Sequence, residues 1–283
     1  MRHLVYLFTM AAMLAMQSCA TCPPSQTGQL IADWNAQRPA KGLSKDMSMK
    51  EAECMREALV AELRKSQGRI IGYKAGLTSK PVQERFGHNA PVRGILLEKM
   101  LLADGAEVSA KFAARPIFEA DLMVEVKDEG INQAKTPAEV LKHIAKIYPF
   151  IELPDLVVAD GEPLNGRIIT AINVGARFGV LGKAIAPNAN ANMLDLLANM
   201  DVIVQDKDGY GLSKGPGKAI LGHPLNAVIW LAEDIAKSGG KLKAGDMLSL
   251  GSFMRQMPPK PGMTVKVTYE GLSGNPAVTV RFK

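Results

Sequence analysis

Residues Phe118–Val126 read FEADLMVEV, in which acidic side chains alternate with apolar ones over most of the stretch. A period of two is typical of a β-strand whose two faces carry different side chains. The alternation places Glu119 and Asp121 together on the face opposite Phe118 and Leu122. Because acidic side chains are usually exposed, the commonest explanation of such a strand is one apolar face and one solvated face.

Similar short apolar segments occur before and after this strand. They are Ile70–Ala75, Gly94–Leu97, Phe150–Leu153, Asp201–Gln205, Met247–Leu250, Thr264–Tyr269 and Val278–Phe282. Helices are fewer: one begins at the cap Thr136 and the first-turn Pro137, and another spans Pro224–Ser238. Many short strands with few helices predict a β-rich α+β domain rather than a doubly wound parallel sheet.

An N-terminal helical arm is predicted over residues 21–68, before the main domain at 69–283. Apolar side chains within Gln29–Asn35 indicate a first short helix. Ser48 and Glu51 have the spacing of a capping box, and apolar residues then recur at helical intervals. The arm therefore contributes two helices.

Residues 1–20 are predicted to be an export signal. The apolar run Leu4–Met16 is shorter than the roughly 20 residues of a membrane span. Maturation near Cys19 leads either to a periplasmic protein or to a lipoprotein anchored at that cysteine. Export permits a disulfide between Cys22 and Cys54, although two free thiols fit the spacing equally well.

Composition excludes one class of partner. The 283 residues are 47% hydrophobic and 22% charged, and the net charge of +6 is spread among interleaved acids. Nucleic-acid binding typically uses a stripe of basic residues with aromatic side chains on which bases stack, and the sequence has neither. A small anionic molecule is the expected partner.

A third acid changes the interpretation of the first two. Glu152 lies inside the apolar run Phe150–Pro154, where an ionised carboxylate is costly to bury without a partner or a metal. With Glu119 and Asp121 it makes three carboxylates without a nearby histidine or cysteine. That ligand set suits a hard cation, Mg²⁺ or Mn²⁺.

Two further side chains are candidates for the chemistry. Lys74 lies in the apolar, glycine-flanked segment Gly72–Gly76, where it either faces solvent or carries a proton for a reaction. Ser252 follows the strand Met247–Leu250 and is either an ordinary turn serine or a contact to a substrate oxygen.

Four motifs occur together in one order along the chain: GYKAGLTS at Gly72–Ser79, FEAD at Phe118–Asp121, LGHPLNA at Leu221–Ala227 and GSFMR at Gly251–Arg255. In this combination the chain resembles the 2-oxopent-4-enoate (2-keto-4-pentenoate) hydratases of the fumarylacetoacetate hydrolase superfamily, which serve the catabolism of aromatic compounds. The resemblance runs from about Leu30 to Phe282. It implies a β-rich mixed-sheet roll of the fumarylacetoacetate hydrolase type, assembled as a homo-oligomer.

The resemblance also implies roles for single residues. Glu119, Asp121 and Glu152 would bind Mg²⁺ or Mn²⁺, Lys74 and Ser252 would be catalytic, and Thr78, Arg93 and Asn173 would contact the substrate. The implied reaction is the metal-dependent addition of water to a small 2-oxo or 2-hydroxy dienoic acid. A 4-oxalocrotonate-type decarboxylase of the same fold and a non-catalytic exported carboxylate-binding protein are the alternatives.

Two segments depart from the family pattern. Where hydratases have two acids, residues His88–Gly94 read HNAPVRG, and the usual Ala-Asp-Asn becomes Ala171–Asn173, AIN. The first change suggests a more anionic substrate, a 2-oxo dicarboxylate clasped by Arg93. Neutral drift of a surface loop explains the same change.

Overall fold

The computed structural model describes residues 22–187 and 191–283. The predicted export signal at residues 1–20, including Cys19 with its proposed lipid, lies outside the described residues. No helix within the described part of the chain is both long and apolar enough to cross a membrane.

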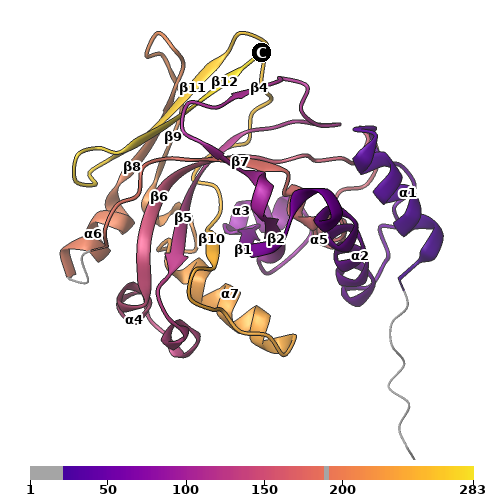
Figure 1. The fold of residues 1–283 in the computed structure, drawn as a ribbon, viewed down its shortest axis with the longest axis horizontal. Coiled ribbons are helices and arrows are strands. Elements are labelled where there is room, and N and C mark those ends of the chain that lie inside the picture. Colours follow the sequence, from indigo (N-terminus) through magenta and orange to yellow (C-terminus); the bar gives the residue numbers. More distant parts are fainter. Residues whose placement is uncertain (1–21, 188–190) are drawn as a thin grey trace, which may run out of the picture.

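Two mixed β-sheets form the body of the molecule (Figure 1). The larger has seven strands in the order β2-β1-β10-β5-β6-β7-β3, and the smaller has five in the order β4-β12-β11-β8-β9. The strands of the larger sheet are β1 (Ile70–Gly76), β2 (Val92–Leu97), β3 (Leu101–Ala103), β5 (Glu119–Val126), β6 (Ile144–Leu153), β7 (Phe178–Leu181) and β10 (Met247–Ser249). Those of the smaller sheet are β4 (Glu107–Val108), β8 (Asp201–Gln205), β9 (Gly211–Pro216), β11 (Thr264–Glu270) and β12 (Ala277–Phe282).

Seven α-helices are described within the same ranges. They are α1 (Pro24–Asn35), α2 (Met49–Gln67), α3 (Lys80–Arg85), α4 (Pro137–Lys142), α5 (Gly166–Ala171), α6 (Ala191–Asn199) and α7 (Asn226–Lys237). The sequence pattern missed α3, α5 and α6. Helices α3 and α5 have only six residues each, too few to show a helical period. The mixed α+β class and the β-rich roll are confirmed.

The larger sheet is covered on both faces. Residues of β5 such as Leu122 and Val124 belong to the core shared with the smaller sheet, whereas Met123 belongs to the core beneath the arm helices. In Figure 1 the arm helices and strands β8, β9 and β11 accordingly lie at opposite sides of the view. The prediction of a solvated face on β5 is therefore wrong, because all residues of the strand except Glu125 are buried.

The N-terminal arm forms as the caps predict. Ser48 accepts from the amide of Glu51, whose carboxylate accepts from the amide of Ser48, and α2 follows directly. A disulfide joins Cys22 to Cys54, with 5.3 Å between the Cα atoms, and so ties the start of α1 to α2. That settles the alternative between a disulfide and two free thiols.

Candidate active site

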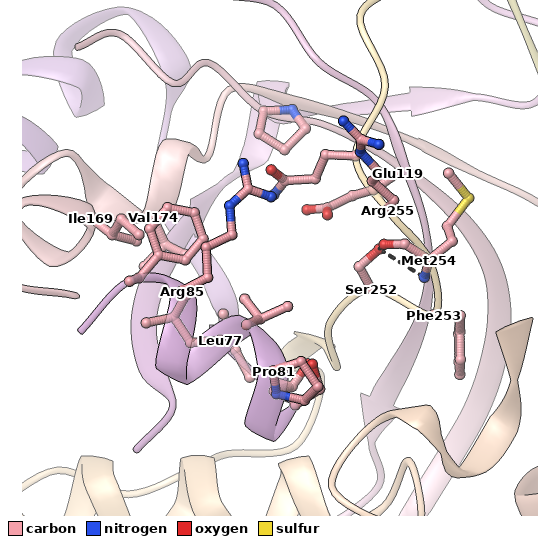
Figure 2. Close-up of a pocket in the computed structure, with 18 of the residues that line it drawn as sticks. Leu77, Pro81, Arg85, Glu119, Ile169, Val174, Ser252, Phe253, Met254 and Arg255 are labelled. Carbon is pink, nitrogen blue, oxygen red and sulfur yellow. Dashed lines mark hydrogen bonds between the residues drawn. The ribbon is translucent and has the colours of Figure 1, made fainter. Parts of the chain in front are cut away.

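A pocket of about 450 Å³ opens beside the carboxyl end of β1 (Figure 2). Its walls come from β1, α3, the start of β5 and the loop after β10. The polar side chains that line it include Lys74, Thr78, Arg85, Glu119, Ser252 and Arg255. Most of the remaining wall is apolar, with Leu77, Ile169 and Phe253 among its residues. A pocket of this size and composition fits a small molecule with an anionic end and a hydrocarbon chain.

Strand pairing brings the predicted acids together. Glu119 on β5 lies directly opposite Glu152 on β6, and Asp121 lies two positions along on the same face of β5. Lys74 makes an ion pair with the Glu152 carboxylate. All four are nearly inaccessible, with exposed fractions of 6% for Glu119, 0% for Asp121 and 2% for Glu152 and Lys74.

Asp121 is fixed by its own strand and by the neighbouring one. Its Oδ1 accepts from the amides of Leu122 at 2.5 Å and Gly251 at 2.9 Å, and its Oδ2 accepts from the Ser249 hydroxyl at 2.5 Å. Burial raises the pKa of Asp121 to about 7, the charge of Glu119 adds to that rise, and the Ser249 hydrogen bond opposes it. Ser249 was not among the predicted site residues, although it is the lone serine in the apolar strand Met247–Leu250.

The cluster contains more acid than base. Burial raises the pKa of Glu152 well above its ordinary value, partly offset by Lys74 and reinforced by Glu119 and Asp121. Three ionised carboxylates with one ammonium leave two negative charges, the deficit that one divalent cation would neutralise. The oxygen donors also suit Mg²⁺ or Mn²⁺. Across residues 22–187 and 191–283, however, no three acidic, imidazole or thiol side chains already surround a common point. Cation binding would therefore require side chains of the cluster to reorient.

Lys74 is positioned by a left-handed turn. Its Nζ donates to the carbonyl oxygen of Val174 at 2.9 Å. Asn173 and Val174 have φ of 56° and 52°, a region that a β-branched residue rarely enters. The turn is secured by Asn173, whose side chain accepts from the amide of Ile95 at 2.7 Å and donates to its carbonyl at 2.9 Å.

Thr78 and Ser252 reach the pocket from two different loops. Both line its wall. The Ser252 hydroxyl donates to the carbonyl of Met254 at 2.9 Å, which ties the loop after β10 into a turn. Within the described residues, the Thr78 hydroxyl has no hydrogen-bond partner, so it is free to meet a ligand.

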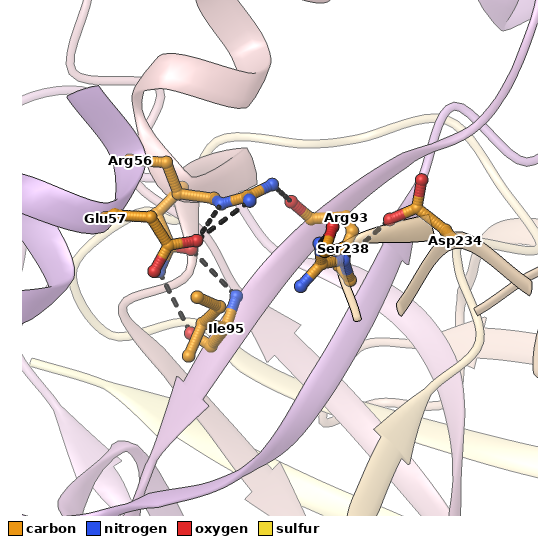
Figure 3. A network of polar contacts seen from close by, with 7 residues as sticks. Arg56, Glu57, Arg93, Ile95, Asp234 and Ser238 are labelled. Atoms are coloured by element: carbon orange, nitrogen blue, oxygen red, sulfur yellow. Dashed lines mark hydrogen bonds and ion pairs between the residues drawn. The ribbon is translucent and has the colours of Figure 1, made fainter. Parts of the chain in front are cut away.

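Two predicted substrate contacts lie elsewhere. Arg93 is directed away from the pocket. Its Nε donates to the Asp234 carboxylate at 2.6 Å, and its Nη2 donates to the Ser238 hydroxyl at 3.2 Å (Figure 3). Its neighbour in this network is Arg56, which donates to the Arg93 carbonyl at 3.0 Å. Asn173 is fully buried and engaged with Ile95, so neither side chain lines the pocket.

The pocket instead contains two arginines that sequence reasoning did not assign. Arg85 is the last residue of α3, and Arg255 ends the GSFMR motif in the loop after β10. Arg255 was within a recognised motif, whereas Arg85 had no signal because α3 itself was not predicted.

Known proteins resemble this chain over most of its length. The 2-hydroxyhexa-2,4-dienoate hydratase of Comamonas testosteroni is 32% identical over 74% of this chain and 78% of its own length. A 2-keto-4-pentenoate hydratase of Burkholderia vietnamiensis is 31% identical over 75% of this chain and 79% of its own. Among solved structures, a 4-oxalocrotonate decarboxylase from Pseudomonas putida, complexed with magnesium and adipate, has a TM-score of 0.78 and 24% identity. That alignment covers 93% of this chain and 99% of the decarboxylase.

No protein-family model matches the chain. The identity and coverage of the two hydratases nevertheless establish the relationship, and the decarboxylase structure agrees with it in fold. The chain therefore belongs to the 2-keto-4-pentenoate hydratase family.

Proposed function

We propose that this chain is a divalent-metal-dependent hydro-lyase that adds water to a small 2-hydroxydienoic acid or its 2-oxo form. The observation that carries the proposal is the buried cluster of Glu119, Asp121, Glu152 and Lys74, of which Glu119 and Lys74 line an apolar pocket. The names of the related hydratases support the reaction class.

Glu119, Asp121 and Glu152 would bind the cation, Mg²⁺ or Mn²⁺. A divalent ion there would supply Lewis-acid polarisation of the 1-carboxylate and 2-oxo oxygens of the substrate. The related decarboxylase structure contains magnesium, and a fumarylpyruvate hydrolase of the same fold contains Mn²⁺.

Side chains of the protein would transfer the proton, orient the substrate and exclude water. Lys74, directed by Glu152 and the Val174 carbonyl, would exchange a proton with the substrate during ketonisation. Thr78 and Ser252 would orient the substrate oxygens through their hydroxyls. The apolar wall would hold the hydrocarbon chain and limit water to the molecule that adds across the double bond.

Turnover of 2-hydroxypenta-2,4-dienoate tests the proposal. The purified protein with Mg²⁺ or Mn²⁺ should bleach the dienol absorbance and form the 4-hydroxy-2-oxo acid, identified by NMR. Protein stripped with a chelator should lose this activity and regain it when the metal is restored. A chelator-insensitive reaction would reject metal dependence, and absence of turnover with any small 2-hydroxydienoate would reject the hydratase.

A decarboxylase is the second candidate, because one solved relative of high similarity is a 4-oxalocrotonate decarboxylase. The two activities differ in product. Decarboxylation releases CO₂ and leaves the double bond unhydrated, so trapping of CO₂ from a 2-oxo-enedioate separates them.

We further propose that the protein is exported and that it assembles as a homo-oligomer. The Cys22–Cys54 disulfide supports export, because such bonds persist in oxidising compartments. Processing at Cys19 or after Ala20 would give a mature chain that starts just before the disulfide. Mass spectrometry of the N-terminus from fractionated cells checks this, and an intact Met1 on cytosolic protein would reject it.

A further inference from the structure

Tyr269 on β11 connects the smaller sheet to the two strands that carry the acidic cluster. Its own strand belongs to the smaller sheet, where Tyr269 is paired with Val202 on β8. The side chain is completely buried in the core shared by the two sheets, and its hydroxyl reaches the backbone of β5 and β6. In Figure 1, β11 lies toward the top of the view, and β5 and β6 lie below it. One side chain therefore spans the space between the sheets and ends at the strands of the proposed cation site.

The Tyr269 hydroxyl meets both strands at a single register position. It donates to the carbonyl oxygen of Asp121 and accepts from the amide of Phe150 at 3.1 Å. Asp121 and Phe150 are directly opposite each other across β5 and β6. A tyrosine hydroxyl can donate one hydrogen bond and accept another, so this hydroxyl can be bonded to both strands at once. The bonds restrain the two strands relative to each other at that position.

The restrained position is part of the strand segment from which the acids project. Two residues along the same pairing, Glu119 on β5 lies opposite Glu152 on β6. Asp121 is itself one of the residues that Tyr269 contacts, through its carbonyl oxygen. The spacing between β5 and β6 sets how far the carboxylates of Glu119 and Asp121 lie from that of Glu152. Tyr269 thus acts on the distance that a shared cation would have to bridge.

A fixed backbone is of value here because the side chains of the cluster have to reorient around a cation. Rotation of a side chain can bring its carboxylate to the ion only if the Cα atoms of the ligands stay at the right separation. Mg²⁺ requires close to ideal octahedral geometry with short bonds, whereas Ca²⁺ accepts longer bonds and flexible geometry. Loosening the two strands should therefore affect a small cation more than a large one.

We propose that Tyr269 is a positioning residue of the cation site. Its hydroxyl holds β5 and β6 at the spacing that lets Asp121 and Glu152 share one small divalent cation. Tyr269 acts through the backbone of these strands and contacts neither the cation nor the substrate. The inference rests on the proposed function for the presence of a cation, and it adds a residue of the smaller sheet to a site built on the larger one.

Cation selectivity tests the role of the hydroxyl. Tyr269→Phe removes the hydroxyl, and its ring can keep the edge-to-face contact with Phe253, whose centre lies 6.3 Å away. Counting free Mn²⁺ by electron paramagnetic resonance gives the Mn²⁺ affinity, and displacement of bound Mn²⁺ by Mg²⁺ or Ca²⁺ gives the other two. The variant should lose at least about tenfold in Mg²⁺ affinity and at most about threefold in Ca²⁺ affinity. Tyr269→Leu also lacks the hydroxyl and should show the same shift in selectivity.

Tyr148→Phe is the matched control. Tyr148 is a buried tyrosine of β6 whose hydroxyl donates to the Glu125 carboxylate at 2.7 Å, and it is not among the described residues that line the pocket. Its variant loses a comparable hydrogen bond and should keep both affinities within about twofold of the parent values. Equal weakening of Mg²⁺ and Ca²⁺ binding in Tyr269→Phe would indicate a structural role only and overturn the proposal. Parent-like affinities in Tyr269→Phe, or the same selectivity shift in Tyr148→Phe, would overturn it as well.

Measurements on the parent protein separate this inference from the proposed function. If the parent binds Mn²⁺ and hydrates a dienoate while Tyr269→Phe keeps the parent selectivity, the positioning role alone is overturned. If the parent binds no Mn²⁺, the metal-dependent function and the positioning role both fail. A selectivity shift in Tyr269→Phe without turnover of any dienoate by the parent would reject the hydratase and support the positioning role.

Discussion

Lys74 and Arg93 are basic side chains on paired strands, but they enter surroundings of different charge balance. Lys74 on β1 is opposite Gly94 on β2, and Arg93 is opposite Ala75, so the two side chains leave the sheet on different faces. Lys74 enters a cluster in which three carboxylates outnumber it. Arg93 enters a network in which Asp234 balances its charge and the Tyr73 ring lies 5.6 Å away.

The difference lies in charge balance rather than in burial. Both side chains are largely buried, at 2% and 7% exposure. In a buried pair of one cation and one anion the charges cancel, so no further ion has to bind. A buried cluster with excess negative charge is stable only when it takes up protons or binds a cation. Clusters of perturbed carboxylates are therefore the stronger indication of a functional site.

The largest expected effect follows from removing the base of the unbalanced cluster. Lys74→Met should lower kcat by about a hundred- to ten-thousandfold, the usual contribution of a positioned acid or base. It should also lower the free energy of unfolding by about 3–5 kcal/mol, because Glu152 loses its buried partner. The double variant Lys74→Met with Glu152→Gln should regain stability in denaturant melts without regaining turnover. Unchanged turnover in Lys74→Met would remove this lysine from the mechanism.

A smaller loss is expected when the turn behind Lys74 is disturbed. Asn173→Ala removes both hydrogen bonds to Ile95 and places alanine at a left-handed φ, so the free energy of unfolding should fall by about 2–4 kcal/mol. Asn173→Gly removes the same bonds without the conformational penalty and should be less destabilised by about 1 kcal/mol. Equal stabilities of the two variants, measured by urea unfolding, would show that the turn carries no strain.

Replacement of Arg93, in the charge-balanced network, should lower stability without lowering activity. Arg93→Met should lower the free energy of unfolding by about 1–3 kcal/mol, because Asp234 is left without its partner while remaining 24% exposed. KM and kcat for any substrate found should stay within about twofold of the parent values, since the side chain does not line the pocket. A selective rise in KM would return Arg93 to the substrate.

The smallest effect concerns the loop that departs from the family pattern. Burial lowers the pKa of His88, and the charge of Arg167 lowers it further. The folded chain therefore binds this proton less readily than the unfolded chain, and stability falls as pH drops below about 6.5. His88→Gln should lose slightly less stability than the parent between pH 7 and pH 5 in thermal melts. A larger acid loss in the variant would contradict the sign of the shift.

The strand segments and the helix caps were readable from the sequence because each depends on neighbours a few residues apart. The strand Glu119–Val126 and the Ser48–Glu51 capping box both appear in the structure, whereas the order of the strands in the sheets was not predicted. The direction of Arg93 was not readable, because it depends on the register between β1 and β2. Ser249 and Arg85 escaped notice for a related reason: their partners lie far away in the sequence or on a helix too short to detect.

Titration of Mn²⁺ into the metal-free protein by calorimetry tests the central claim, that the unbalanced cluster binds one divalent cation. The parent should bind one equivalent per chain, and Glu152→Ala and Glu119→Gln should each bind at least about tenfold more weakly. Asp234→Asn, which removes an acid from the balanced network, should bind as the parent does. Parent-like affinity in Glu152→Ala, or a loss of affinity in Asp234→Asn that matches it, would contradict the account.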